Sequence, residues 1–351
     1  MTSETITELR SLTTLRIGGP ARRFTVATST DELLSAVAEA DAADLPVLLI
    51  GGGSNLLIGD AGFDGLVIHV ATRGITPVSV DYCGGAEVLV AAGEPWDGFV
   101  ATAVDAGWIG LEALSGIPGS TGATPVQNVG AYGQEVAGAV ATVRTWDRAT
   151  SRIRTLAAAE CQFGYRDSLF KRERYRGGPR YVVLEVGFQL VVADRSEPVR
   201  YAELARTLGV PVGTRVPLAD VRQAVLGLRR GKGMVLDDDD HDTWSAGSFF
   251  TNPLLPMDAA AALPADAPRW STEDGRVKTS AAWLIEHAGF AKGHGLPGPA
   301  SVSTKHTLAL TNRGPATAAD LLTLARAVRD GVEAAFGVHL VPEPELVNCA
   351  L

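Results

Sequence analysis

The sequence has little cysteine, since Cys83, Cys161 and Cys349 are the only three among 351 residues. They are odd in number and far apart, and no pair has the spacing of a metal site, so we expect no disulfide framework and a reducing compartment. Long apolar runs are also missing, and none reaches the length of a transmembrane helix. Residues 1–15 lack the basic start and apolar centre of a signal peptide. These absences predict a cytoplasmic protein.

Positive charge is in the minority, with 31 Lys and Arg against 40 Asp and Glu and a formal net charge of -9. No polybasic segment offsets this balance, which argues against nucleic acid or an anionic membrane as the partner. Five of the histidines, His69, His241, His287, His294 and His339, show no metal-ligand spacing. The acidic run 237–240 lacks the alternation and terminal Glu of a calcium loop. We therefore expect no metal site.

What the chain does contain is a mixture of strand and helix patterns, with hydrophobic residues making up 46% of it. The first third alternates the two patterns, and strands prevail over 140–190. The strands expected from apolar runs are 24–27, 47–50, 66–68, 182–190, 308–310 and 338–346. The helices expected from caps and spacing are 31–42, 95–106, 201–208, 218–228, 281–288 and one that begins after Thr317. These patterns predict an α+β protein.

Two glycine-rich loops are the most informative feature. The first, Gly51-Gly52-Gly53-Ser54-Asn55, follows an apolar strand, and the second runs from Leu114 to Gly133. Glycines let successive backbone N–H groups converge on one anion, and neighbouring hydroxyls add donors, so a diphosphate suits such loops. The spacing fits neither a P-loop nor the Rossmann fingerprint. Either loop alone could be no more than a tight turn, but the two together favour a diphosphate cofactor.

These loops resemble the FAD-binding region of the PCMH, or vanillyl-alcohol-oxidase-type, flavoproteins. Within that group the chain most resembles the bacterial UDP-N-acetylenolpyruvoylglucosamine reductase family, type I. The likeness extends through the strings 165–168 (YRDS), 247–253 (GSFFTNP) and 342–345 (PEPE) and covers nearly the whole chain.

The resemblance implies a two-part FAD-binding region at 1–236, divided into about 1–75 and 76–236. A smaller α/β substrate-binding domain would follow at 237–337, and a strand at 338–351 would return to the active site. The family binds FAD, here expected to be non-covalent, and takes electrons from NADPH to reduce the enolpyruvyl group of a nucleotide sugar for peptidoglycan synthesis. We expect a monomer.

Matching the family's motifs gives the expected site residues. The residues expected to hold FAD are Gly51, Gly52, Gly53, Ser54, Asn55, Ser115, Gly116, Ile117, Pro118, Gly119, Ser120, Gly122, Ala123, Asn128, Gly130, Ala131, Tyr132 and Arg229. Those expected to hold the substrate are Tyr165, Tyr201, Lys232, Asn252 and His306. His306 stands where relatives often carry Gln, so its contribution is left open.

The chemistry of the reaction explains three catalytic candidates. Hydride addition to an enolpyruvyl ether builds negative charge that spreads into the carboxylate, so the site needs a cation there and an acid for the adjacent carbon. Arg166 offers a fork that fits a carboxylate, although an ion pair with Asp167 or Glu185 is the alternative. The resemblance assigns protonation to Ser248, which could otherwise cap a turn. The resemblance also places Glu345 beside the intermediate. The alternative is that Glu345 is an ordinary surface carboxylate.

Two other functions remain open. An FAD-dependent sugar alcohol or aldonolactone oxidase of the same fold group would use the glycine loops but leave Ser248 and Glu345 without a role. A flavin-free nucleotide-sugar-binding protein would use Lys232 and Tyr201 but not the long second loop.

Overall fold

The computed structural model describes residues 7–272 and 274–351. Residues 1–6, where the segment tested for a signal peptide begins, lie outside the described part. The chain forms two compact units, which are described separately. The first comprises Ala21–Gly52 and Asp64–Gly231 together with Thr7, and the second comprises Glu8–Pro20, Gly53–Phe63 and Lys232–Leu351. The predicted functional division at residue 236 stays a prediction.

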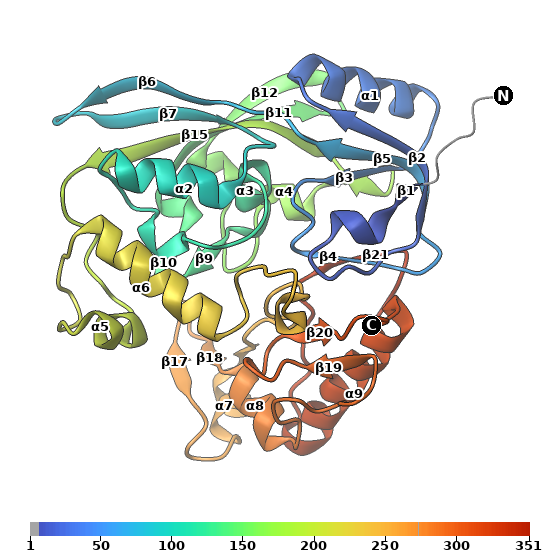
Figure 1. Ribbon diagram of the computed structural model, residues 1–351, viewed down its shortest axis with the longest axis vertical. Coiled ribbons are helices and arrows are strands. Elements are labelled where there is room, and N and C mark those ends of the chain that lie inside the picture. Colours follow the sequence, from blue (N-terminus) through green and yellow to red (C-terminus); the bar gives the residue numbers. More distant parts are fainter. Residues whose placement is uncertain (1–6, 273) are drawn as a thin grey trace. The chain divides into compact units, whose positions relative to one another are not determined.

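The larger sheet of the first unit is antiparallel. Its strands lie in the order β12 (Arg152–Ala157), β11 (Val140–Asp147), β15 (Tyr181–Val192), β7 (Gly85–Ala91) and β6 (Ile75–Asp81), and β8 (Trp108–Ile109) pairs with one end of β15. Figure 1 shows β15 running through the middle of this sheet, with α2 (Trp96–Asp105) against one face. Buried residues recur along β11 with half-buried residues between them, so one face of the strand is more fully covered than the other.

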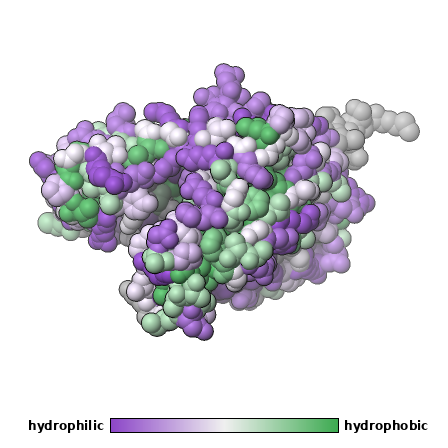
Figure 2. Space-filling view, turned by 90° about the horizontal axis from the view of Figure 1, so that it is seen from below, coloured by the Kyte–Doolittle hydropathy of each residue, from purple (hydrophilic) through white to green (hydrophobic). Residues whose placement is uncertain are grey.

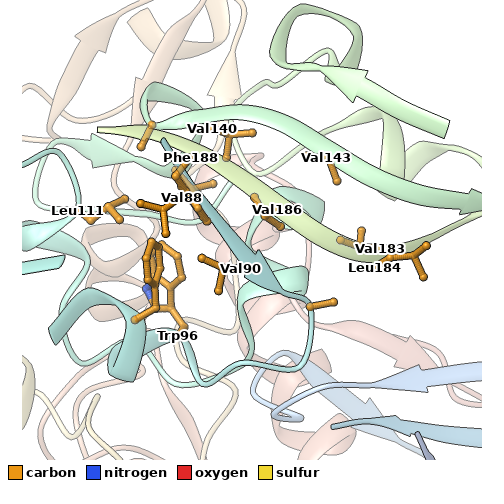
Figure 3. Close-up of a cluster of buried hydrophobic side chains, with 14 of the residues drawn as sticks. Val88, Val90, Trp96, Leu111, Val140, Val143, Val183, Leu184, Val186 and Phe188 are labelled. Carbon is orange, nitrogen blue, oxygen red and sulfur yellow. The ribbon is translucent and has the colours of Figure 1, made fainter. Parts of the chain in front are cut away.

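The core of the first unit lies between this sheet and α2. Trp96 and Phe99 project from the helix, and the Phe99 ring lies 4.8 Å from that of Phe188 on β15. Figure 3 shows Trp96 facing the valines that project from the neighbouring strands, including Val88 and Val186. These side chains are fully buried, so each contributes about 1.5–3 kcal/mol by leaving water.

A second sheet of the first unit has the strand order β1 (Thr7–Glu8), β2 (Pro20–Ala27), β5 (Phe63–Val70) and β3 (Val47–Ile50), with β3 and β5 parallel. The helix α1 (Thr30–Ala42) precedes β3. Ser29 begins it with a capping box, in which Glu32 bonds back to the Ser29 backbone. The predicted strand–helix–strand run is confirmed, and β3 delivers the chain directly into the first glycine loop.

The first unit ends in a helical part. The helices α5 (Ala202–Leu208) and α6 (Leu218–Gly231) pack through a small core that includes Leu204, Val221 and Val225. The remaining short elements of this unit are α3 (Thr124–Gln127), α4 (Leu169–Arg172), β9 (Gly130–Ala131), β10 (Gln134–Glu135), β13 (Arg174–Tyr175) and β14 (Gly178–Pro179).

The second unit is built from small sheets and one long helix. The helix α9 (Ala318–Phe336) is capped by Thr317 and ends at Gly337, where φ is 66°. It buries Leu321, Ala325 and Val328 in the core of this unit. The other elements are β4 (Leu56–Ile58), β16 (Leu254–Leu255), α7 (Met257–Ala261), β17 (Arg269–Ser271), β18 (Val277–Thr279), α8 (Ala281–His287), β19 (Ala300–Val302), β20 (Leu310–Asn312) and β21 (Glu345–Val347).

The end of the chain differs from the sequence prediction. A strand over 338–346 was expected, but only Glu345–Val347 is a strand, pairing in parallel with β4. Pro342 and Pro344 lack the backbone N–H that a ladder needs, so the preceding segment makes only an isolated bridge between Phe250 and Pro342. The expected strand at 308–310 likewise lies slightly later, at Leu310–Asn312.

The surface mixes both residue classes, and Figure 2 shows hydrophobic residues lying between hydrophilic ones on one face. Within residues 7–272 and 274–351, no helix combines the length and apolar character needed to cross a membrane. The same residues contain no group of three or more His, Cys, Asp or Glu side chains that could hold a metal ion. The predicted α+β fold class is confirmed.

Candidate active site

The two glycine loops meet in the first unit. Gly51 and Gly52 follow β3, and Gly119 and Ser120 belong to the loop after α2. A Cβ on Gly52 would lie 2.6 Å from the Gly119 Cα, and one on Gly51 would collide with the Ser120 hydroxyl. Only glycine permits the two backbones to lie this close. The structure therefore brings together two loops that the sequence places nearly 70 residues apart.

This contact leaves hydrogen-bond donors available. Among residues 7–272 and 274–351, no protein acceptor takes the backbone N–H of Gly52 or Gly119. By contrast, the N–H groups of Thr121 and Gly122 donate to Glu94 O and Ala92 O at 2.8 Å, which fixes the end of the second loop. Two closely approaching glycine loops with available N–H groups suit the diphosphate of a dinucleotide. The loops thus fit FAD.

The remainder of the first loop belongs to the second unit. Gly53 has φ of 60° and packs against the Leu12 backbone, where a Cβ would collide. Asn55 donates from Nδ2 to Glu343 O at 3.3 Å, and Asn55 O accepts the backbone N–H of Glu345 at 3.0 Å. The structure therefore places Asn55, expected to hold the cofactor, directly beside the strand that carries Glu345.

The continuation of the second loop is held by an asparagine. Asn128 is 1% exposed with φ of 43°, and its Nδ2 donates to Glu135 Oε2 and Gly164 O, both at 2.9 Å. Its Oδ1 accepts the Ala137 N–H at 3.2 Å. Every polar group of this side chain is occupied by the protein, so Asn128 shapes the loop rather than presenting its side chain to a ligand.

Arg166 lies against the same continuation. Its Nη2 donates to Gly130 O at 2.8 Å and its Nη1 to Asn128 O at 3.4 Å. Its guanidinium lies 5.5 Å from the centre of the Tyr165 ring. Arg166 has φ of 53°, an uncommon conformation for a residue with a side chain and one typical of functional sites. Of the two ion-pair partners considered for it, Asp167 pairs with Arg172.

Tyr201 and Tyr132 contact one another, with ring centres 5.5 Å apart at an angle of 85°. Tyr201 is 46% exposed at the start of α5, so it is accessible to a ligand. Arg229, half-buried on α6, has its pKa lowered to about 10 by burial, while Tyr132 and Asp97 act in the opposite direction. It stays charged at neutral pH.

Two residues of the first unit were missed by the sequence analysis. Lys171 Nζ donates to Gln127 Oε1 at 3.2 Å and to Arg166 O at 3.1 Å, which ties α4 to the loop. Asp97 accepts the Gly116 N–H at 2.6 Å, at the start of the long loop. Lys171 follows the YRDS string closely, which was a usable signal, whereas nothing in the sequence distinguishes Asp97 from other helix carboxylates.

Ser248 lies in the second unit, half-buried after Gly247, whose φ is 73°. The next residues, Phe249 and Phe250, are each 1% exposed, with ring centres 5.1 Å apart. The backbone N–H of Phe249 donates to Leu308 O at 2.7 Å. Ser248 is therefore followed directly by two buried aromatic side chains that anchor its segment.

The substrate candidates of the second unit have different settings. Asn252 accepts the Ala281 N–H through Oδ1 at 3.0 Å, so this side chain helps to begin α8. His306 lies in a turn where its own N–H donates to Ser303 Oγ at 3.2 Å. Lys232 is half-buried at the start of this unit. That Arg166, Ser248 and Glu345 converge on one substrate stays a prediction.

Comparisons with known proteins give consistent results. Residues 21–156 match a family described as an FAD binding domain, and residues 239–347 match one described as the C-terminal domain of UDP-N-acetylenolpyruvoylglucosamine reductase. The chain is 57% identical to a protein of that name from Cutibacterium acnes, over 98% of this chain and 90% of the relative. It is 55% identical to one from Streptomyces coelicolor, with the same two coverages.

A solved structure is also similar. The crystal structure of UDP-N-acetylenolpyruvylglucosamine reductase from Thermus caldophilus matches with a TM-score of 0.65 and 26% identity, covering 98% of each chain.

Proposed function

This chain belongs to the UDP-N-acetylenolpyruvoylglucosamine reductase family, and from that premise we propose that it reduces UDP-N-acetylglucosamine enolpyruvate to UDP-N-acetylmuramate with electrons from NADPH. This reaction supplies a peptidoglycan precursor. The structural observation that carries the proposal is the close contact of Gly51 and Gly52 with Gly119 and Ser120, which forms a cradle for a diphosphate cofactor.

The cofactor is FAD, since the chain contains an FAD binding domain. When bound, FAD would supply the redox chemistry, that is, hydride transfer between NADPH and the enolpyruvyl group. The backbone N–H groups of Gly52 and Gly119 would bind its diphosphate, and Asn55, Tyr132 and Arg229 would complete the binding site. Asn128 would act by holding the loop in shape, because the protein occupies its side chain.

Arg166 would bind the carboxylate of the enolpyruvyl group. Negative charge that builds beside this carboxylate during hydride addition is stabilised by a guanidinium that is already oriented. The bonds from Arg166 to Gly130 O and Asn128 O supply that orientation, since they fix the plane of the fork. Lys171 donates a hydrogen bond to Arg166 O and so helps to hold the backbone of Arg166 itself.

Ser248 would deliver the proton to the carbon that receives charge. A serine hydroxyl is a weak acid in water, so it serves only a strongly basic carbon in a site that excludes water. The two buried phenylalanines that follow it support such an environment. Glu345, at the start of β21, would hydrogen-bond the enolic intermediate or relay the proton.

The remaining candidates would bind the nucleotide sugar. Tyr201 is exposed and would close over it, and Lys232 would contact its diphosphate as a point charge. Asn252 and His306 would contact nearby groups. We further propose that the enzyme works as a monomer in the cytoplasm, with the functional domains divided at residues 236 and 337. Sedimentation of the purified protein tests the monomer.

The test of the function is the visible spectrum of the purified protein under anaerobic conditions. Flavin absorbance should be present, should be bleached by NADPH, and should return when UDP-N-acetylglucosamine enolpyruvate is added. Protein without flavin would exclude the reductase. Rapid oxygen consumption with sugar alcohols, and no recovery with the enolpyruvyl substrate, would instead support an oxidase.

A further inference from the structure

Asp242 is a buried carboxylate of the second unit that takes no direct part in the proposed reaction. It lies in a short 3-10 turn, His241–Thr243, and is 4% exposed. Its Oδ1 accepts the Thr304 N–H at 2.8 Å, and its Oδ2 accepts the Thr304 hydroxyl at 2.5 Å. Arg313 donates to Oδ1 at 3.0 Å and balances the charge. Both carboxylate oxygens are therefore committed to fixed partners.

These partners connect two segments that carry proposed site residues. Asp242 precedes Ser248 by six residues, and Thr304 precedes His306 by two. A second connection lies at the other ends of the same segments, where the Phe249 N–H donates to Leu308 O at 2.7 Å. Ser248 thus lies between Asp242 and Phe249, and His306 lies between Thr304 and Leu308. The two segments are joined on both sides of the residues that they carry.

The connection at Asp242 also reaches a third segment. Gly233, with φ of 65°, packs so closely that a Cβ there would lie 2.9 Å from Asp242 O. The residue before it is Lys232. On the far side of Asp242, Thr243 Oγ1 donates to Asp240 O at 2.8 Å, and Thr14 Oγ1 donates to Ser245 O at 2.7 Å. The backbone that leads from Asp242 to Ser248 is therefore held at Thr243 and at Ser245.

The charge of Asp242 is stable in this setting. Burial alone would raise its pKa, but hydrogen bonds from Thr304 and Ser303 and the positive charge of Arg313 outweigh burial, and the net pKa is lowered. The carboxylate is ionised at neutral pH, where its charge-assisted hydrogen bonds are strongest.

We propose that Asp242 is a positioning residue for the reductase reaction, which sets the spacing between the Ser248 segment and the His306 segment. The inference rests on the proposed function. Proton delivery by Ser248 requires placement within a fraction of an ångström, and small displacements of a reacting group lower rates steeply. The Phe249 bond fixes one end of each segment. The other ends are joined by the buried Asp242 and by the more exposed pair of Lys305 and Asp240, so loss of Asp242 would leave only that exposed pair to hold them while the fold remains.

The test uses the FAD-loaded enzyme and measures the two half-reactions separately by stopped flow. In Asp242→Asn, flavin reoxidation by saturating UDP-N-acetylglucosamine enolpyruvate should slow by roughly 10- to 100-fold. Flavin reduction by NADPH should stay within about threefold of wild type, since it needs no proton from Ser248. Reoxidation within threefold of wild type, or equal slowing of both half-reactions, would overturn the proposal.

A matched control separates positioning from stability. Asp320 accepts a threonine N–H at 2.9 Å and the same threonine's hydroxyl at 2.7 Å, as Asp242 does, but its partner is Thr317 at the start of α9. Asp320→Asn should lower the melting temperature and leave both half-reactions at wild-type rates. Slowing of reoxidation in this variant as large as in Asp242→Asn would refute a specific role.

Thr304 gives a second route if Asp242→Asn fails to fold. Thr304→Val removes the hydroxyl bond and should slow reoxidation in the same direction by a smaller factor, whereas Thr304→Ser keeps the hydroxyl and should restore the rate. Equal rates for the Val and Ser variants would overturn the proposal. A wild-type enzyme that NADPH reduces but the enolpyruvyl substrate does not reoxidise would instead refute the proposed function.

Discussion

Asp97 and Arg222 are joined by two hydrogen bonds in the first unit, from Nη1 to Oδ1 at 2.6 Å and from Nη2 to Oδ2 at 3.0 Å. The same Oδ1 accepts the Gly116 N–H at 2.6 Å. One carboxylate on α2 therefore connects α6 to the first residues of the long glycine loop. Burial raises the pKa of Asp97, but the bonds from Arg222 and Gly116 outweigh it and lower the pKa.

Asp97→Asn should lower the free energy of unfolding by about 1–3 kcal/mol at pH 7, because Arg222 loses its charged partner. The folded pKa lies below the value of ~3.9 in the unfolded chain, so the contribution is complete above that value and is lost as pH falls through the folded pKa. Urea unfolding at pH 7 and at low pH measures this, and the difference from wild type should shrink in acid.

The surface pair of Arg22 and Asp64 serves as control for that prediction. Their bond is 2.8 Å long, but their side chains are 59% and 83% exposed. Asp64→Asn should change the free energy of unfolding by less than about 1 kcal/mol, because water already screens such a pair. If both variants lower the free energy of unfolding equally, then the bonds of Asp97 stabilise the fold no more than an exposed ion pair does.

Much of the local structure could be predicted from the sequence because the signals are local. Caps and glycine stops each act within one helical turn. α1 and α2 accordingly lie within one residue of the predicted 31–42 and 95–106, and α9 begins directly after Thr317 as predicted. The glycine loops could also be predicted, because a run of glycines directly after an apolar strand is a distinct sequence pattern.

The pairing of distant segments could not be predicted in this way. β4 and β21 are separated by nearly the whole chain, and each is three residues long. No periodicity in either segment indicates the other, so the inclusion of Gly53–Phe63 in the second unit had no local signal. The buried bonds of Asn128 and Asp242 are likewise invisible in the sequence, because Asn and Asp are common turn residues.

Gly52→Ala tests the cradle formed by the two glycine loops. The added Cβ would lie 2.6 Å from the Gly119 Cα, and backbone cannot rotate away as a side chain can, so the loops must separate. The purified variant should retain much less FAD, measured as the ratio of flavin to protein absorbance. Gly227→Ala is the control, since a Cβ there has no neighbour within 4 Å and the residue lies inside α6. It should keep full FAD and gain about 0.5–1 kcal/mol. Equal FAD content in both variants would contradict the cradle.

The three cysteines should react at very different rates. Burial raises the pKa of Cys161 to about 12, and burial also raises the pKa of Cys349, whereas Cys83 is exposed. Because the thiolate is the reactive form, a thiol reagent at mildly alkaline pH should label Cys83 quickly, the half-buried Cys349 more slowly, and Cys161 only after unfolding. Counting labels by mass spectrometry checks this, with Cys83→Ser as the control that should lose the fast label. Fast labelling of Cys161 would contradict its burial.

Arg166→Lys should lower turnover by roughly 10-fold or more even though the charge is kept, because an ammonium cannot hold a carboxylate with two parallel bonds. The lysine would also lose the two bonds to Gly130 O and Asn128 O that orient the fork. Steady-state kinetics measures this loss of turnover. Arg172→Lys is the control, because Arg172 forms a partly exposed ion pair with Asp167 and has no proposed role in binding the carboxylate. Similar turnover in both variants would remove Arg166 from the carboxylate site.

Ser248→Ala separates the two halves of the reaction most clearly. Flavin reduction by NADPH needs no proton from this hydroxyl and should be nearly unchanged, whereas reoxidation by the enolpyruvyl substrate should slow by roughly 10²–10⁴-fold, the usual contribution of general acid catalysis. The substitution removes one oxygen from a half-buried side chain, so the fold and the FAD content should be retained. Ser271→Ala, at an exposed position of β17, should leave both half-reactions unchanged. If Ser248→Ala slows both half-reactions alike, then the proton comes from another group, and Glu345 becomes the first candidate to replace.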